Sequence, residues 1–156
     1  MNGFERPVII GDIDDDTVDK IFEICPGTRV EGLPENKVTP ETKTDNVWGP
    51  WLRIVRAWAG NQKIRFEGST GGVLTALAQF LLNDKRVDFI LHVKASNKEP
   101  TFGKRYLSFT EDDVLEAVGS RYGPAAPLID IDEVLARGQT FAFIGKPCDI
   151  AALRNL

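Results

Sequence analysis

The run VDFILHVKA, from Val87 to Ala95, constrains the fold of this chain more than any other segment. It is apolar almost without interruption, and a β-strand of this kind is typical of a sheet that is covered on both faces. Apolar residues at helical spacing precede it and predict a helix over residues 70–83 that packs in the core. TFAFIG, residues 140–145, predicts a second buried strand. The alternation predicts an α/β fold, with a mixed or mostly parallel sheet and crossover helices.

Further elements are predicted around this core. Strands are expected at LRIVRAWA (52–59) and KRYLSFT (104–110), with an edge strand within residues 1–12. Residues 26–50 hold four prolines and three glycines, and we expect them to be a long irregular segment. Short helices are predicted at VDKIFEIC, after the capping run Asp14 to Thr17, and at VLEAVG, after a cap-like pattern of Thr110 and Asp113. Two more are predicted at DIDEVLARG and at KPCDIAALRNL, where Pro147 lies near the first turn.

Length and charge narrow the class of protein. A chain of 156 residues suits one domain and can bury a core without a disulfide or a metal. The net charge of -4 and the short, interrupted basic clusters argue against nucleic-acid binding. No apolar run reaches the roughly 20 residues of a membrane span. We therefore expect a cytoplasmic protein, in which two distant cysteines are thiols or ligands before they are a disulfide.

The most unusual loop, Gly68 to Gly72, places Ser69, Thr70, Gly71 and Gly72 directly in front of the apolar helix. Such glycines permit positive φ and close approach of the backbone, and free N–H groups at a helix N-terminus suit an anion. The loop matches neither the P-loop nor the dinucleotide-binding pattern. A capped helix entry, in which the glycines only allow tight helix packing, is the other interpretation.

Two more loops are candidate sites. Cys148 lies in the first turn of the last predicted helix beside Lys146, where a thiolate is stabilised and can serve as a nucleophile or a metal ligand. It can equally be a small buried apolar residue. In the loop from Ser120, Arg121 can clamp a phosphate or carboxylate and Tyr122 can stack on a ring; a turn with a surface arginine is the alternative.

Other chemically notable residues point to packing. Cys25 has no second cysteine at CxxC spacing and is expected to be a lone buried residue. His92 lies inside an apolar strand and is expected to be a hydrogen-bonded core histidine rather than a ligand. The three tryptophans are expected to pack in the core or in loops: Trp48, Trp51 and Trp58.

Taken together, three motifs resemble the coenzyme-F-type (deazaflavin) hydrogenase/dehydrogenase beta-subunit family. They are STGGVLTALAQFLL, GSRYGPAAPL and FAFIGKPCDIAALRNL, in this order. CPG at residue 25 and WGPWLRIVRAWAGNQKIRFEGSTGG also fit the N-terminal part of that family. The resemblance covers most of the chain, from about Cys25 to Leu156.

The resemblance implies a flavin-dependent, iron-sulfur-linked oxidoreductase module that transfers electrons or hydride. FAD is the implied cofactor, and a deazaflavin coenzyme, a ferredoxin or another subunit is the implied redox partner; relatives include the reductase of hydroxymethyl chlorophyll. Cys148 would be a ligand of an iron-sulfur cluster. The residues expected around the flavin are Ser69, Thr70, Gly71, Gly72, Thr75, Ser120, Arg121, Tyr122 and Lys146.

The chain also departs from the family. Members continue past AALRNL into a region with further cysteines, and a four-iron cluster usually needs four; with two here, we expect a complete cluster only in a longer chain. We expect an N-terminal fragment or a truncated member, with a helix and irregular segment over 1–50 and a flavin-binding α/β core over 51–156. An apolar face left open on the last helix would favour a homo-oligomer.

Two other functions stay open. The chain could be a truncated, non-enzymatic homologue that binds a partner or serves a structural role. The second open function is that of a thiol enzyme with Cys148 as its nucleophile. His92 is a poor general base for such an enzyme, because it is predicted to lie inside a strand.

Overall fold

A central sheet of three strands organises the chain in the computed structural model, which describes residues 5–30, 32 and 35–156. Its order is β4-β3-β5, formed by β3 (Phe89–Ala95), β4 (Gly103–Ser108) and β5 (Phe141–Phe143). β3 and β4 pair as an antiparallel hairpin in which His92 faces Tyr106. β5 returns parallel to β3, with Leu91 opposite Phe143. The predicted α/β class with a mixed sheet is confirmed.

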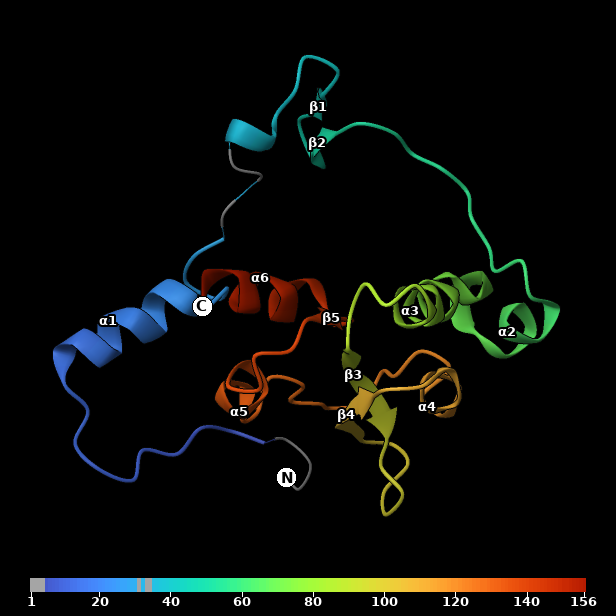
Figure 1. Ribbon diagram of the computed structural model, residues 1–156. Helices are drawn as coiled ribbons and strands as arrows, with labels where there is room; N and C mark the ends of the chain where they lie inside the picture. The colour runs from blue at the N-terminus through green and yellow to red at the C-terminus, as the bar shows by residue number, and fades with distance from the viewer. Residues whose placement is uncertain (1–4, 31, 33–34) are drawn as a thin grey trace.

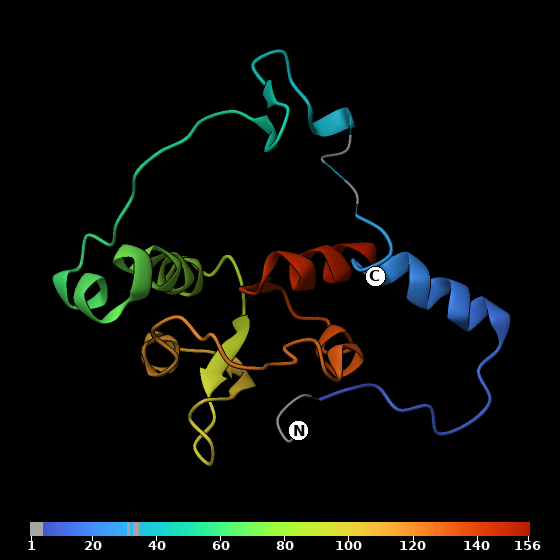
Figure 2. The ribbon, with the colours of Figure 1, turned by 180° about the vertical axis from the view of Figure 1, so that it is seen from behind.

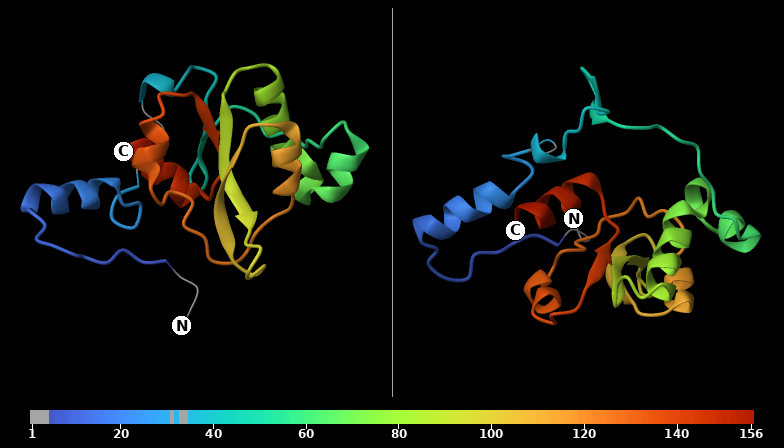
Figure 3. Two further views of the ribbon diagram at one scale, coloured as in Figure 1. Left: turned by 60° about the horizontal axis from the view of Figure 1, so that its bottom comes forward. Right: turned by 45° about the horizontal axis from the view of Figure 1, so that its top comes forward.

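Helices cover both faces of the sheet, as the apolar run of β3 predicts (Figures 1 and 3). On one face, Ile90 packs with Ala78 of α3 (Val73–Asn83) and Val114 of α4 (Glu111–Glu116). On the other face, Phe89 and Leu91 pack with Val134 of α5 (Ile131–Leu135). Alternate side chains of a strand point to opposite faces, so a strand buried on both faces must be apolar at successive positions.

The predicted helix caps are present. The side chain of Asp14 accepts a hydrogen bond from the Thr17 N–H (2.7 Å) at the start of α1 (Asp15–Ile24). Thr110 and Asp113 form a capping box at the start of α4. Pro147 begins α6 (Pro147–Asn155), where its missing N–H has no partner to lose. Local sequence therefore determines where these three helices begin.

The N-terminal helix lies against the C-terminal one. α1 contacts α6, and the Asn155 side-chain amide donates to the Glu23 carbonyl oxygen at 3.4 Å (Figure 2). This contact joins two segments from opposite ends of the sequence. It places Cys25, two residues after Glu23, near the end of α6 that is far from Cys148.

Two predicted strands are wrong. Residues 53–59 form no strand, and Leu52, Ile54 and Val55 are exposed on a long connection that leads from β2 to α2 (Figure 1). A strand needs a neighbour for its backbone groups, and β-forming residues do not supply one. Residues 5–12 also form no strand, while residues 1–4 lie outside the described residues.

The segment 26–50 contains more structure than expected, and one helix was missed. Short elements interrupt the segment: η1 (Glu35–Lys37), β1 (Lys43–Asp45) and β2 (Gly49–Trp51), the last two as a hairpin. The missed helix, α2 (Gln62–Glu67), is polar and short, although its cap Asn61 is an ordinary start signal. α3 begins at Val73, three residues later than predicted.

Burial also differs from the sequence expectation. In α3 only Ala78 and Gln79 are buried, and Leu74 and Leu77 are substantially exposed, so the helix covers the sheet without being enclosed. Cys25 is exposed rather than buried, and Trp48 and Trp58 are exposed as well. Within the described ranges, no helix has both the length and the apolar character that crossing a membrane requires.

Candidate functional site

The Ser69 cavity, about 530 Å³ in volume, lies where β5 ends, beside His92 and Val93 of β3. Three loops and the start of α3 close around it. Its apolar lining comes from Leu74, Val93, Val114, Ala117, Ala125 and Ile144. Its polar lining comes from Ser69, Thr75, His92, Ser120, Arg121, Tyr122, Lys146 and Asp149. An apolar hollow with a few converging polar groups is the usual form of a small-molecule site.

The turn before α3 has an unusual backbone. η2 (Ser69–Gly72) contains three successive residues with positive φ: Thr70 at 54°, Gly71 at 73° and Gly72 at 70°. A Cβ on Gly72 would lie 2.5 Å from the Ile64 carbonyl oxygen of α2, so only glycine fits there. Thr70 is β-branched and is strained in this conformation. The glycines thus serve the close packing of η2 on α2, and Ser69 is the residue of this turn that lines the cavity.

A hydrogen bond joins the turn to the loop after α4. The backbone N–H of Ser120 donates to the Ser69 hydroxyl at 2.8 Å, across 51 residues of sequence. In the same loop Arg121 donates to the Val118 carbonyl oxygen (3.1 Å), and Tyr122 is 97% exposed. The first two predicted motifs therefore meet at one wall of the cavity, with a guanidinium and an open aromatic ring at its rim.

The third motif also lines the cavity, through Ile144, Gly145, Lys146 and Asp149. Lys146 precedes α6, and its ammonium lies 3.4 Å from a carboxylate oxygen of Asp149. The Lys146 backbone N–H also donates to that carboxylate (3.3 Å), which holds the loop against the first turn of the helix. Cys148 is exposed and does not line the cavity. This part of the lining therefore offers a partly neutralised cation and no thiol.

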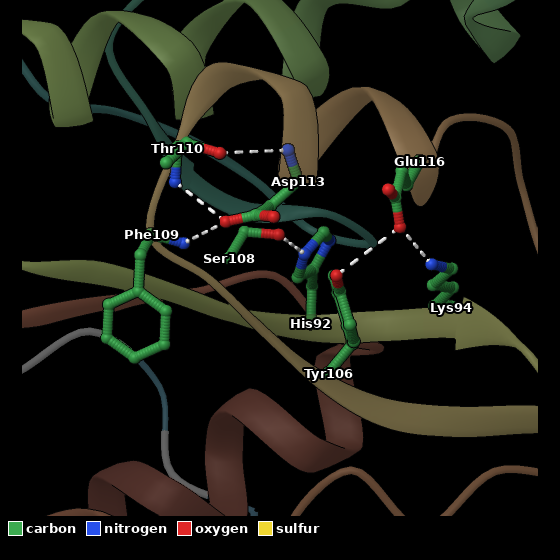
Figure 4. Close-up of polar contacts among 8 residues, drawn as sticks. All are labelled: His92, Lys94, Tyr106, Ser108, Phe109, Thr110, Asp113 and Glu116. Atoms are coloured by element: carbon green, nitrogen blue, oxygen red, sulfur yellow. Dashed lines mark hydrogen bonds and ion pairs between the residues drawn. The ribbon is translucent and has the colours of Figure 1, made fainter.

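His92 lies in the wall of the cavity and is 7% exposed. Its Nε2 is 2.7 Å from the hydroxyl of Ser108, which is fully buried, and its ring lies against Tyr106 (Figure 4). Burial, and next the positive charge of Lys94, lowers the pKa of His92 from 6.5 to about 4. The imidazole is therefore neutral at physiological pH. The expectation of a hydrogen-bonded core histidine is correct, but the sequence did not indicate its place beside a cavity.

Charged groups next to His92 hold α4 on the hairpin. Lys94 forms an ion pair with Glu116, which raises the pKa of Lys94, and the Tyr106 hydroxyl lies 3.4 Å from the same carboxylate (Figure 4). The N–H groups of Phe109 and Thr110 both donate to Asp113 at 3.0 Å, and the bond from Phe109 is the main cause of its lowered pKa. These contacts fix the wall of the cavity that α4 provides.

Stability should fall in mild acid because of His92. In the unfolded chain the imidazole binds a proton at a higher pH than in the folded chain, so the free energy of unfolding decreases as the pH falls through this window. We expect a loss of about 2 kcal/mol between about pH 7.5 and about pH 5. Urea unfolding at both pH values measures it. The His92→Gln variant should lose most of this difference; an equal pH dependence in both proteins would contradict the assignment.

The structure brings together six of the predicted cofactor-binding residues: Ser69, Thr75, Ser120, Arg121, Tyr122 and Lys146. Thr70, Gly71 and Gly72 lie beside them in η2 but do not line the cavity. Sequence reasoning missed His92 and Asp149. Asp149 had a usable signal, since an acidic residue three positions after a helix start is typical of a capping box. His92 had none, because its strand pattern indicates only burial.

The cysteines do not form a metal centre here. Across residues 5–30, 32 and 35–156 no group of three or more His, Cys, Asp or Glu side chains comes together to hold a metal ion. Cys25 and Cys148 are both exposed and free. The residues that the structure describes therefore do not fit an iron-sulfur cluster, which usually needs four cysteine thiolates.

Comparisons with known proteins match this region. Residues 54–131, half of the chain, match the family model for coenzyme F420 hydrogenase/dehydrogenase, beta subunit N-term. An uncharacterized protein of Methanocaldococcus jannaschii is 25% identical over 138 residues, which are 86% of this chain and 35% of that protein. The family match includes Ser69 and the loop from Ser120, and it ends before Lys146.

A solved structure shares the fold. A chain of the F420-reducing NiFe hydrogenase complex from Methanosarcina barkeri superposes with a TM-score of 0.57 at 23% identity. The match covers 62% of this chain and 34% of that one. This chain thus spans about a third of the length of both proteins.

Proposed function

We propose, from the premise that this chain belongs to the coenzyme F420 hydrogenase/dehydrogenase beta-subunit family, that it is a flavin-binding oxidoreductase module. The family match confirms the resemblance, and it covers the first two of the three motifs. One observation carries the proposal. Residues of all three motifs, far apart in sequence, line one cavity of about 530 Å³.

The chemistry of the lining fits FAD. A flavin ring needs an apolar slot, which Leu74, Val114 and Ile144 supply, and its diphosphate needs cations and hydrogen-bond donors. Arg121 and Lys146 are cations on two separate loops, so both can approach one anionic group. The donor set of the cavity therefore suits a ligand with an aromatic part and an anionic part.

Each site residue receives a role in this proposal. Ser69, Thr75 and Ser120 donate hydrogen bonds to the cofactor, Arg121 and Lys146 offset its phosphate charge, and Tyr122 covers the ring. Thr70, Gly71 and Gly72 act less directly, because they shape the turn that presents Ser69. A bound flavin supplies the hydride and electron transfer chemistry, while the protein orients it and excludes water.

The redox partner is part of the proposal. The similar solved chain comes from a hydrogenase complex, which supports a partner subunit, and the family name supports a deazaflavin coenzyme as donor or acceptor. We propose a cytoplasmic setting on the same grounds. Cys148 is exposed and could ligate a cluster only with thiolates from outside the described residues. The division at residue 50 stays a prediction.

Titration of the purified chain with FAD tests the proposal. Quenching of flavin fluorescence should report a specific complex. The Arg121→Gln and Lys146→Gln variants should each bind FAD roughly tenfold more weakly, because each loses a charge-assisted contact to phosphate. Riboflavin, which has no phosphate, should bind these variants and the unmodified chain alike. Arg65→Gln is the matched control, since Arg65 is an exposed arginine outside the cavity.

A folded chain that binds neither FAD nor riboflavin would contradict the flavin proposal. It would favour the second candidate, a protein-binding module without catalysis. The exposed apolar side chains of Leu52, Ile54, Val55 and Trp58 support that candidate, because neighbouring exposed apolar residues often mark a binding surface.

A further inference from the structure

His92 is the one histidine of the chain. Its ring is 7% exposed and lies in the wall of the Ser69 cavity. Of its two ring nitrogens, Nε2 contacts the Ser108 hydroxyl at 2.7 Å. Ser108 is completely buried, so this side of the imidazole is closed to solvent and to any ligand.

The other nitrogen, Nδ1, is open to the cavity. Within the described part of the chain, every fully buried side-chain nitrogen or oxygen has a hydrogen-bond partner. The hydrogen bond recorded for the His92 ring uses Nε2. Nδ1 must therefore be accessible, and the hollow next to this residue is the Ser69 cavity.

We propose that His92 recognises the cofactor, hydrogen-bonding through Nδ1 to the polar edge of a heteroaromatic ring bound in the Ser69 cavity. This inference rests on the proposed function and adds a residue that none of the three sequence motifs contains. The position of His92 suits a contact with the edge of a ring. Val114 and Ala117, which also line the cavity, are apolar, so among these three residues only His92 can form a hydrogen bond with a ligand.

Burial keeps His92 neutral, and the charge of Lys94 acts in the same direction. Lys94 is on the same face of β3, and its positive charge opposes a second one on the imidazole. From α4, Glu116 is engaged by Lys94, and Asp113 is engaged by backbone N–H groups. From β4, the Tyr106 ring contacts the imidazole, with ring centroids 5.8 Å apart.

The charged groups at the cavity rim do not favour a positive charge on the His92 imidazole. Arg121 is a cation and cannot favour a positive imidazole, and the carboxylate of Asp149 is paired with Lys146. The histidine contact should therefore be the same from about pH 6 to about pH 8.

Ser108 allows either tautomer. Its hydroxyl can donate to Nε2, which puts the proton on Nδ1 and makes it a donor, or accept from Nε2, which makes Nδ1 an acceptor. Because the Ser108 hydroxyl has no other hydrogen bond among the described residues, no second partner fixes it as donor or acceptor. The polar edge of the bound ring then decides which tautomer His92 adopts.

The single histidine makes a direct test simple. The chain is produced with ¹⁵N-labelled histidine, and the two imidazole nitrogens are followed by NMR while FAD is added. Free protein should show a neutral ring at about pH 7. Saturation with FAD should shift the Nδ1 resonance and leave one tautomer. Binding of FAD with both imidazole resonances unchanged would overturn the inference and leave the proposed function standing; absence of FAD binding would overturn both.

Variants supply a second measurement. His92→Phe keeps an aromatic ring and loses the hydrogen bond, so FAD should bind roughly tenfold more weakly. His92→Gln keeps a neutral polar group, and it should recover most of the affinity and change the absorbance of the bound flavin. Thermal unfolding of the same samples shows whether each variant is folded. Equal FAD affinity in folded His92→Phe and in the unmodified chain would count against the contact.

Discussion

Replacement of Gly123 by alanine is expected to destabilise the chain by about 3 kcal/mol, at the upper end of overpacking effects. An added Cβ would overlap the carbonyl oxygen of Thr101 and lie 2.9 Å from its carbonyl carbon. The Thr101 carbonyl group belongs to the backbone, so it cannot rotate away from the added Cβ as the end of a flexible side chain can. The two segments are also tied together, because the Gly103 N–H donates to the Pro124 carbonyl oxygen at 2.8 Å. Relief of the overlap therefore requires that this bond lengthen or break.

The same substitution should weaken FAD binding. Gly123 follows Arg121 and Tyr122 directly, and all three line the Ser69 cavity, so a displaced loop moves the rim of the site. We expect roughly tenfold weaker binding of FAD. Urea unfolding and fluorescence titration measure the two effects. Gly60→Ala is the control, since a Cβ there meets nothing within 4 Å and should leave both quantities unchanged. Wild-type stability in Gly123→Ala would show that the two loops can separate.

Replacement of Phe89 by alanine should cost about 4 kcal/mol of unfolding free energy, a value typical of large-to-small changes in a core. The Phe89 side chain is fully buried on the α5 face of the sheet. Its ring stacks on Phe141 of β5, with centroids 5.3 Å apart, and meets Phe109 at 5.5 Å. The lost ring would leave a cavity between β3, β5 and α5 and weaken the parallel pair on which the Ser69 cavity is built.

Phe66→Ala provides the matched comparison. Phe66 lies in α2 and is 91% exposed, so its removal should change stability by less than about 0.5 kcal/mol. Chemical unfolding of both variants under the same conditions gives the difference. A cost below about 1.5 kcal/mol for Phe89→Ala would mean that the core can collapse around the missing ring.

Features with a local cause were readable in the sequence. Thr110 and Asp113 cap α4 through contacts three residues apart, and Gly119 and Gly138 adopt positive φ after the predicted helices. The apolar run of β3 indicated a strand covered on both faces, because burial on two sides requires apolar residues at successive positions. Each of these depends on a pattern within a short stretch of chain.

Features that need a distant partner were not readable. The β-forming residues 52–59 resemble a strand, yet a strand exists only where another strand satisfies its backbone, and no pattern in the segment specifies one. The glycines of η2 illustrate the same limit. The sequence showed a tight turn, but only the position of Ile64 shows that Gly72 serves packing on α2 while Ser69 lines the cavity.

The sequence by itself determined the α/β class, most helix starts and the three motifs that identify the family, since these rest on short-range periodicity and residue type. Tertiary structure alone decided that the motifs share one cavity, through contacts such as the one between Ser69 and Ser120. It also decided that His92 lies beside that cavity with one nitrogen closed by Ser108. Such juxtapositions depend on how the helices and loops close over the sheet, and that closure is set by packing between residues distant in sequence.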